Sequence, residues 1–204
     1  MRDPAIPRLV LASASPRRTA LLAQLGLPHE VRPAHILEEA WPGETPVEHV
    51  ERLAAAKASA VAASHPDALV LGGDTVVLLD DALLGKPTDT EGAVRMLLSL
   101  SGREHTVVSA LALAGPAGAG PSVVTRTAQV EMRAFDEWAA RAYVATGEPM
   151  DKAGAYGIQG AGAALVSRVE GDYYTVVGLP VSGLIDLLRE AGWPYGFGGL
   201  GTGR

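Results

Sequence analysis

The chain of 204 residues contains no cysteine. This absence excludes disulfides, thiolate nucleophiles, iron–sulfur clusters and thiolate zinc sites, and it fits a reducing compartment. No apolar run reaches the roughly 18 residues that a membrane helix needs, and the first residues lack the apolar segment of a signal peptide. We therefore expect a cytoplasmic protein with no membrane partner.

Positive charge is also scarce, because 17 Lys and Arg stand against 23 Asp and Glu, which gives a formal net charge of −6. No overall positive field exists to hold a nucleic-acid polymer, so any phosphate recognition must come from local basic residues. The P-loop pattern, a strand-linked GxGxxG and a credible serine-nucleophile pattern are all missing. The five histidines are scattered without metal-ligand spacing.

Hydrophobic residues make up 48% of the chain, and charged residues 20%, which is a globular composition. Apolar runs alternate with apolar positions at helical spacing, and some neighbouring strands are joined by turns of hairpin length. These patterns predict an α/β domain with a mixed sheet over residues 1–195, followed by a loose glycine-rich tail, residues 196–204. The predicted strands cover residues 8–12, 68–71, 76–79, 105–114, 123–132, 164–169 and 173–177, and turns at residues 72–75, 115–121 and 170–172 separate them. The predicted helices cover residues 16–25, 45–63, 89–98, 136–146 and 181–191.

Several helix ends are marked by capping residues. Thr45 and Glu48 form a capping box, in which each side chain bonds the other's backbone N–H. Thr88 and Glu91 have the same spacing and predict a second box. Gly26 is a suitable C-terminal stop for the first helix.

The segment SASPRR, residues 13–18, is the first chemical signal. Ser15 suits an N-cap, so Arg17 and Arg18 fall in the first helical turn, where cations are unfavourable by about 1 kcal/mol or less. A bound anion such as phosphate would offset that cost. The alternative is that both arginines point into water and pair with surface carboxylates.

Lys57 and Asp74 are the next signals. Lys57 lies on the apolar side of its helix, so it either has a buried partner or extends its ammonium to water. Asp74 lies in the segment GGDT at residues 72–75, and its carboxylate could bind a divalent metal or deprotonate a water molecule. The alternative is a plain turn, because Asp and Gly are ordinary turn residues. Lys86, after the next turn, has the same ambiguity.

Residues 147–160 contain four glycines and Gln159. The glycines indicate a loop whose backbone passes close to another group, and an amide side chain can both donate to and accept from a pyrimidine edge. A purely structural glycine loop explains the composition equally well.

Together these segments resemble the Maf family in order and spacing. The matching motifs span about residues 9 to 190, and they are LASASPRR at 11–18, RLA at 52–54 with KA at 57–58, GDT at 73–75, GKP at 85–87, SGR at 101–103, EPMDKAGAYGIQG at 148–160, EGDY at 170–173 and VGLP at 177–180. The family consists of nucleoside triphosphate pyrophosphatases, also called septum formation inhibitors. The segment with Gln159 resembles the dTTP/UTP pyrophosphatase branch.

The resemblance implies a mixed, twisted sheet flanked by helices, with two lobes around a cleft, similar to inosine triphosphate pyrophosphatases. It implies that Asp74 activates water and that Glu38, or its neighbour Glu39, joins Asp74 in serving a divalent metal, Mg or Mn. The substrate-binding residues that it implies, for the triphosphate or for base selectivity, are Ser13, Arg17, Arg18, Lys57, Thr75, Lys86 and Gln159.

The activity implied is hydrolysis of dTTP, UTP or modified pyrimidine nucleotides to the monophosphate and pyrophosphate. Water would attack the α-phosphorus while the metal and the cationic side chains neutralise the leaving pyrophosphate. The alternative is a regulator of cell division that binds nucleotides without hydrolysing them. The family also leads us to expect a homodimer.

Overall fold

The structure, a computed structural model, describes residues 6–80, 82–116 and 120–201. The strands form a mixed sheet with the order β2-β1-β3-β5-β6-β7, and β4 pairs with β3. β1 runs parallel to β2 and β3, whereas the β3–β4 and β6–β7 pairs are antiparallel. The expectation of an α/β fold with a mixed sheet is therefore confirmed. No helix in the described ranges is long and apolar enough to cross a membrane.

The chain divides into two compact units. Unit 1 comprises Met1–Asp74, Ser109–Arg126 and Gly178–Arg204, and unit 2 comprises Thr75–Val108 and Thr127–Val177. The long strands β3 (Leu69–Leu79), β5 (Glu104–Ala114) and β6 (Ser122–Met132) contribute residues to both units.

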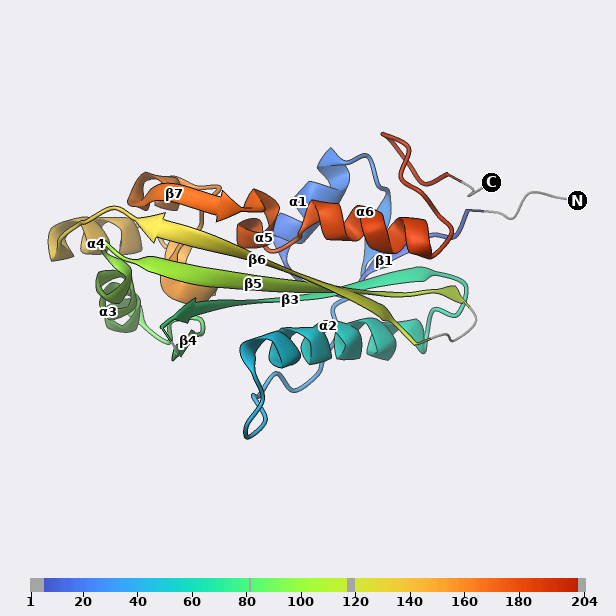
Figure 1. Cartoon of the computed structure of the whole chain (residues 1–204), viewed down its shortest axis with the longest axis horizontal. Coiled ribbons are helices and arrows are strands. Elements are labelled where there is room, and N and C mark those ends of the chain that lie inside the picture. Colours follow the sequence, from blue (N-terminus) through green and yellow to red (C-terminus); the bar gives the residue numbers. More distant parts are fainter. Residues whose placement is uncertain (1–5, 81, 117–119, 202–204) are drawn as a thin grey trace, which may run out of the picture. The chain divides into compact units, whose positions relative to one another are not determined.

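Unit 1 also contains β1 (Leu9–Leu11), β2 (His29–Val31), α1 (Pro16–Gln24), α2 (Pro46–Ala62) and α6 (Val181–Glu190). Figure 1 shows α2 on one side of the strands of this unit, and α1 and α6 on the other. A Cβ on Gly72 would meet α2, and a Cβ on the next residue, Gly73, would meet the Arg18 side chain of α1. Since successive strand residues point to opposite faces, helices cover β3 on both sides here.

Unit 2 contains β4 (Ala82–Leu84), α3 (Thr90–Leu100), α4 (Glu137–Val144), β7 (Val166–Gly171) and α5 (Tyr173–Val177). Three short 3-10 helices, η2 (Glu148–Asp151), η3 (Ala153–Ala155) and η4 (Ala161–Leu165), lie in the segment between α4 and β7. Leucines and valines of α3, β5 and β6 form the core of this unit together with Tyr143 and Tyr156.

The predicted turn at residues 72–75 is wrong, because β3 continues through it. Gly72 permits close packing of α2, and Gly73 permits close approach of the Arg18 side chain of α1, rather than chain reversal. A Cβ on Gly72 would lie 2.2 Å from the carbonyl oxygen of Ala54 and 2.7 Å from the backbone nitrogen of Ala58. Glycine within a strand often marks such a close approach of another backbone.

Two local predictions at helix starts are also wrong. Residues 173–177 form α5 and not a strand, because Asp172 accepts hydrogen bonds from the backbone N–H of Tyr174 (3.0 Å) and the hydroxyl of Thr175 (3.1 Å), which favours a helical turn. α3 is capped by Asp89, which accepts from the N–H of Gly92 at 2.6 Å, so the expected Thr88–Glu91 box does not form.

The predicted strand at 164–169 is shifted, because residues 164–165 belong to η4 and β7 continues through residues 170–171 of the predicted turn. Three predictions at helix ends are confirmed. Ser15 caps α1, Gly26 follows that helix with φ +67°, and Thr45 and Glu48 form the capping box of α2. Residues 195–200 form a turn, closed by a bridge between Tyr195 and Leu200, where we expected a loose tail. Residues 202–204 of that tail and residues 117–119 of the predicted turn at 115–121 lie outside the described residues.

Candidate active site

A cluster of one lysine and two carboxylates lies within unit 1. The Lys57 ammonium nitrogen is 2.7 Å from Asp74 Oδ1 and 2.7 Å from Glu38 Oε1. The Lys57 side chain is 9% exposed and that of Asp74 12%, whereas the Glu38 side chain is 53% exposed. Lys57 therefore has a buried partner, Asp74, so its ammonium does not simply extend from the apolar side of α2 into water.

Asp74 owes its place to β3, whose preceding residues, Leu69–Gly73, are buried. With Gly72 packed against α2 and Gly73 against α1, the strand is held on both faces immediately before Asp74. A buried carboxylate needs an opposite charge or hydrogen-bond donors, and Lys57 supplies both. The carboxylate is thus fixed in position while a small part of it stays accessible to solvent.

Arg18 is the second fixed cation of unit 1. Its Nη1 donates to Ser13 Oγ at 2.9 Å, and its Nε donates to the carbonyl oxygen of Gly178 at 2.8 Å. Burial lowers the pKa of Arg18, an effect that the charge of Asp74 opposes and that of Arg17 reinforces. Arg18 therefore does not point into water, which was the alternative for both arginines. Arg17 is partly exposed.

These contacts concentrate charge at the start of α1. The helix presents its first N–H groups there, with the Ser15 side chain accepting from the N–H of Arg18 at 3.5 Å. The positive end of the helix dipole and two guanidinium groups form a setting that favours an anion.

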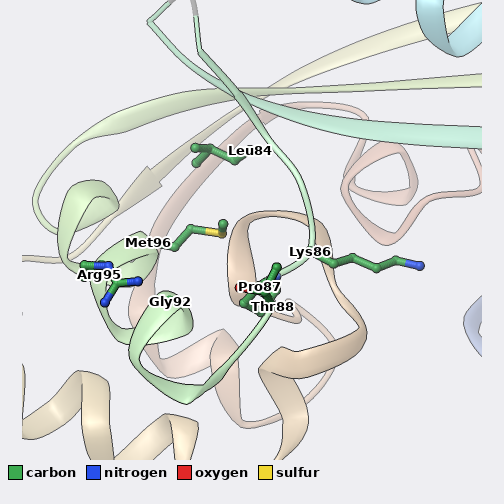
Figure 2. A pocket seen from close by; sticks show the side chains of 7 residues that line it. All are labelled: Leu84, Lys86, Pro87, Thr88, Gly92, Arg95 and Met96. Atoms are coloured by element: carbon green, nitrogen blue, oxygen red, sulfur yellow. The ribbon is translucent and has the colours of Figure 1, made fainter. Parts of the chain in front are cut away.

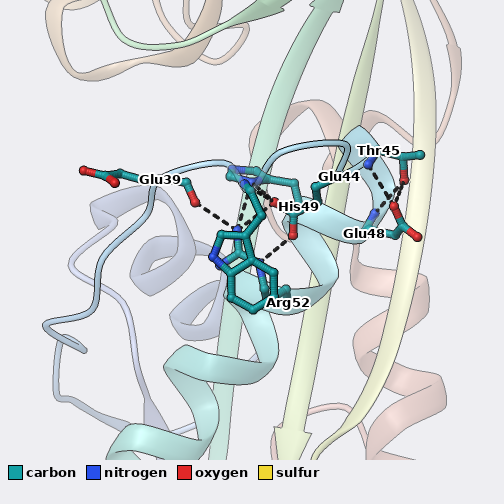
Figure 3. A network of polar contacts seen from close by, with 7 residues as sticks. Glu39, Glu44, Thr45, Glu48, His49 and Arg52 are labelled. Atoms are coloured by element: carbon teal, nitrogen blue, oxygen red, sulfur yellow. Dashed lines mark hydrogen bonds and ion pairs between the residues drawn. The ribbon is translucent and has the colours of Figure 1, made fainter.

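Figure 3 shows a network of polar contacts between α2 and the irregular segment that carries Glu38 and Glu39. Arg52 donates to Glu44 from Nε (2.5 Å) and Nη2 (2.8 Å), and Nη2 also donates to the carbonyl oxygen of Glu39 at 3.0 Å. The Glu44 side chain is only 6% exposed, and its hydrogen bonds, above all those from Arg52, hold its pKa well below the usual range. The guanidinium of Arg52 also lies 4.1 Å from the centre of the Trp41 ring.

This network anchors the backbone on the C-terminal side of Glu38. Glu39 takes part through its carbonyl group, while its side chain is exposed, so of the two neighbouring glutamates the one that pairs with Lys57 is Glu38. Sequence reasoning assigned no role to Arg52, Glu44 or Gly178. Arg52 lies in the matching motif RLA and Gly178 in the matching motif VGLP. Their presence in these motifs was the sequence signal that could have identified them.

The remaining predicted site residues, Thr75, Lys86 and Gln159, belong to unit 2. Thr75 is partly buried on β3, and Lys86 is exposed between β4 and α3. Figure 2 shows a hollow beside Lys86, whose ammonium points away from the other lining residues, Leu84, Pro87, Thr88, Gly92, Arg95 and Met96. The charge of Lys86 is therefore directed elsewhere than into this hollow.

Gln159 is an exposed residue in a turn between Gly157 and Gly160. The segment around it is held by Glu148, whose carboxylate accepts hydrogen bonds from Tyr143, Ala161 and Gly162. Burial alone would raise the pKa of Glu148, but these hydrogen bonds lower it overall. The glycine-rich segment is therefore an ordered structure built around one carboxylate.

No group of three or more His, Asp or Glu side chains with metal-binding geometry occurs in the part of the chain that the structure describes. The carboxylates that the sequence proposed for a metal, Glu38 and Asp74, both contact the Lys57 ammonium. They thus converge on one cation, which is a protein ammonium here.

The fold and these contacts define an α/β protein with a lysine–dicarboxylate cluster close to a buried arginine at the start of a helix. A family model described as Maf-like protein matches residues 8–191. The chain therefore belongs to the Maf-like family.

Curated relatives cover nearly the whole chain. A dTTP/UTP pyrophosphatase of Moorella thermoacetica is 55% identical over 187 residues, which are 91% of this chain and 95% of the relative. A protein of the same name from Desulfotalea psychrophila is 51% identical over 180 residues, 88% of this chain and 92% of the relative. The solved structure of the Staphylococcus aureus Ham1 protein has a TM-score of 0.44 at 18% identity, covering 61% of this chain and 71% of that one.

Proposed function

We propose that this protein hydrolyses nucleoside triphosphates, with dTTP and UTP preferred, to the nucleoside monophosphate and pyrophosphate. The observation that carries the proposal is the Asp74 carboxylate, held at 2.7 Å by Lys57 in the same unit as the buried Arg18. The names of the relatives, dTTP/UTP pyrophosphatases at 55% and 51% identity, support the reaction and the base class. The proposal treats residues 1–195 as one catalytic domain.

The triphosphate is bound by cationic and hydroxyl groups. In unit 1, Arg17, Arg18, Lys57 and the hydroxyl of Ser13 supply donors for phosphate oxygens, and Arg18 is already oriented by Ser13 and Gly178. Lys86 is also proposed to bind the triphosphate. Fixed cations stabilise the negative charge that develops on the leaving pyrophosphate.

Asp74 acts as the general base. Its carboxylate accepts a proton from water as the water oxygen forms a bond to the α-phosphorus, and the bond from that phosphorus to the oxygen bridging to the β-phosphate breaks. The electron pair of that bond leaves with the pyrophosphate. Lys57 keeps the carboxylate in one orientation, so that its accessible oxygen faces the incoming water.

A divalent metal, Mg or Mn, fits these residues. Mg²⁺ is commonly held by one or two carboxylates and completes its shell with phosphate oxygens and water. The carboxylates of Glu38 and Asp74 both contact the Lys57 ammonium, so they lie close to each other. The Glu38 side chain is half exposed, so a metal ion bound to the substrate could reach it. When bound, the metal would neutralise phosphate charge.

Arg17, Thr75 and Gln159 are proposed to select the base. The exposed side-chain amide of Gln159 can accept a hydrogen bond from the N3–H of a uracil or thymine edge and donate one to the neighbouring carbonyl oxygen. Modified pyrimidines with the same edge are further candidate substrates.

A nucleotide panel tests this proposal. The purified protein is incubated with UTP, dTTP, CTP, ATP, GTP and 5-methyl-UTP, each with Mg or Mn, and pyrophosphate and phosphate are measured separately. We expect pyrophosphate and the monophosphate from UTP and dTTP, little product from purine nucleotides, and no product when the metal is chelated.

Other outcomes would overturn parts of the proposal. Free phosphate as the first product would place the attack at the γ-phosphorus. Tight binding of UTP without any product would favour the alternative, a nucleotide-binding regulator of cell division. The cytoplasmic location and the homodimer stay predictions.

A further inference from the structure

The turn that carries Gln159 contacts the core of unit 2 through the partly buried Ile158. Gln159 itself is exposed, Gly160 follows it directly, and a 3.3 Å hydrogen bond from the N–H of Gly160 to the carbonyl oxygen of Gly157 closes the turn. Glycine-rich backbone has a high conformational entropy, so a defined position for Gln159 needs an external anchor.

Glu148 anchors the C-terminal side of this turn. Its Oε2 accepts the N–H of Ala161 at 2.8 Å, and its Oε1 accepts the N–H of Gly162 at 3.3 Å. The backbone of Glu148 is itself fixed, because the Lys152 ammonium donates to its carbonyl oxygen at 2.6 Å. One carboxylate therefore determines where the two residues after Gly160 lie.

Tyr143 anchors the N-terminal side. Its hydroxyl accepts the N–H of Gly157 at 2.9 Å and donates to Glu148 Oε1 at 2.8 Å. Tyr143 lies on α4 with its ring in the core of unit 2. The two side chains thus form a continuous chain of hydrogen bonds that reaches both flanks of Gln159 and ends in the core.

The glycines of this segment fit tightly around the two anchoring side chains. A Cβ on Gly160 would lie 2.4 Å from Glu148 Oε2, and a Cβ on Gly162 would lie 2.5 Å from the hydroxyl oxygen of Tyr143. A side chain at either position would displace the anchor. These glycines therefore serve close contact with Glu148 and Tyr143.

We propose that Tyr143 and Glu148 are positioning residues that determine base selectivity by fixing the backbone of Gln159. This inference rests on the proposed function, in which the amide of Gln159 reads the base. An amide discriminates between base edges only when its donor and acceptor are held in place, since a mobile amide rotates to suit a wrong edge. Neither anchoring residue is among those proposed to bind phosphate or activate water.

The test measures selectivity in variants that remove single polar groups. Tyr143→Phe removes only the hydroxyl, and Glu148→Gln keeps the side-chain volume but replaces one accepting oxygen by a donor group. For each variant, kcat and KM are measured with UTP and with CTP. We expect KM for UTP to rise at least tenfold while kcat at saturating UTP changes less than threefold, and the preference for UTP over CTP to fall at least tenfold.

Tyr156→Phe is the matched control. It removes another buried hydroxyl from the same core, one whose hydrogen-bond partner is His105 at 2.8 Å. We expect it to lower thermal stability without changing the preference for UTP over CTP. Glu148→Gln, at a half-buried position, provides an independent test should Tyr143→Phe fold poorly.

The outcomes separate this inference from the function on which it rests. Gln159→Ala is included as a reference that removes the amide itself. The positioning role is overturned if Gln159→Ala loses the preference for UTP while Tyr143→Phe and Glu148→Gln keep it, or if both variants lose activity with all nucleotides equally. If the unmodified protein releases pyrophosphate from no nucleotide, the proposed function fails and this inference fails with it.

Discussion

His105 gives the protein a stability that depends on pH. It lies on β5 in unit 2 and is 2% exposed. Its Nε2 is 2.8 Å from the Tyr156 hydroxyl, and Nδ1 is buried with no hydrogen-bond partner among the described residues. Burial lowers the pKa of His105 from 6.5 to about 4. The folded protein therefore keeps this imidazole neutral at pH values where the unfolded chain protonates it.

The size of the effect follows from the two pKa values. Stability is lost as the pH falls below 6.5, because the unfolded state binds the proton first, and the loss continues down to the folded value of about 4. A pH of 5 lies 1.5 units below the pKa of 6.5 that the imidazole has in the unfolded chain. Since one unit corresponds to about 1.4 kcal/mol, the free energy of unfolding should fall by about 2 kcal/mol between pH 7.5 and pH 5 through this residue alone.

Urea unfolding at pH 7.5 and pH 5.0 measures this loss. His105→Gln removes the titrating group and keeps a polar partner for Tyr156, so we expect the variant to lose about 2 kcal/mol less than the wild type over this range. His35→Gln, the same change at an exposed position, is the control and should behave like the wild type. An equal loss in His105→Gln and wild type would refute the reasoning.

Three further predictions concern packing and local order. Gly72→Ala should cost about 3 kcal/mol or more in urea unfolding because its Cβ would meet rigid backbone of α2, while Gly115→Ala, with nothing within 4 Å, should change stability by less than about 0.5 kcal/mol. Thr45→Ala should lower the free energy of unfolding by about 1 kcal/mol through loss of the N-cap, and Thr45→Ser should recover most of it. Arg52→Gln should accelerate cleavage by a glutamate-specific protease after the exposed Glu39, because the contacts that anchor this segment to α2 are lost. Unchanged cleavage would argue against this anchoring.

Local sequence rules predicted the helices well because their ends are fixed by nearby residues. Ser15, Thr45 and Gly26 act through contacts within a few positions, so the sequence alone contains the relevant information. The capping residue of α3 was misplaced by one position because Asp89, next to Thr88, competes for the same role. Such competition is decided by geometry that spacing does not contain.

The errors in the strands have a long-range cause. Residues 72–75 have the composition of a turn, and the approach of α2 to Gly72 and of the Arg18 side chain to Gly73 explains why two glycines stand in a continuous strand. Residues 173–177 have strand-forming side chains, but the hydrogen bonds of Asp172 start a helix there. Tertiary contacts and a local cap therefore overrode propensity.

The candidate site was predicted in part. The position of Lys57 on the apolar side of α2 signalled a buried charge, and the structure shows its partners, Asp74 and Glu38. Although the VGLP motif contains Gly178, no local spacing relates its carbonyl group to Arg18, which lies 160 residues away. The same holds for Glu44, whose role depends on the folding of an irregular segment against Arg52.

The central claim, that Asp74 is the base of a pyrophosphatase, is tested most directly by Asp74→Asn. The variant keeps the size and one accepting oxygen of the side chain but removes its basic carboxylate, and general-base catalysis contributes about 100- to 10 000-fold to rates. We measure pyrophosphate release from UTP with Mg, together with UTP binding by calorimetry. The account predicts a loss of turnover of about this size with UTP binding largely kept, and turnover at the wild-type rate would contradict it.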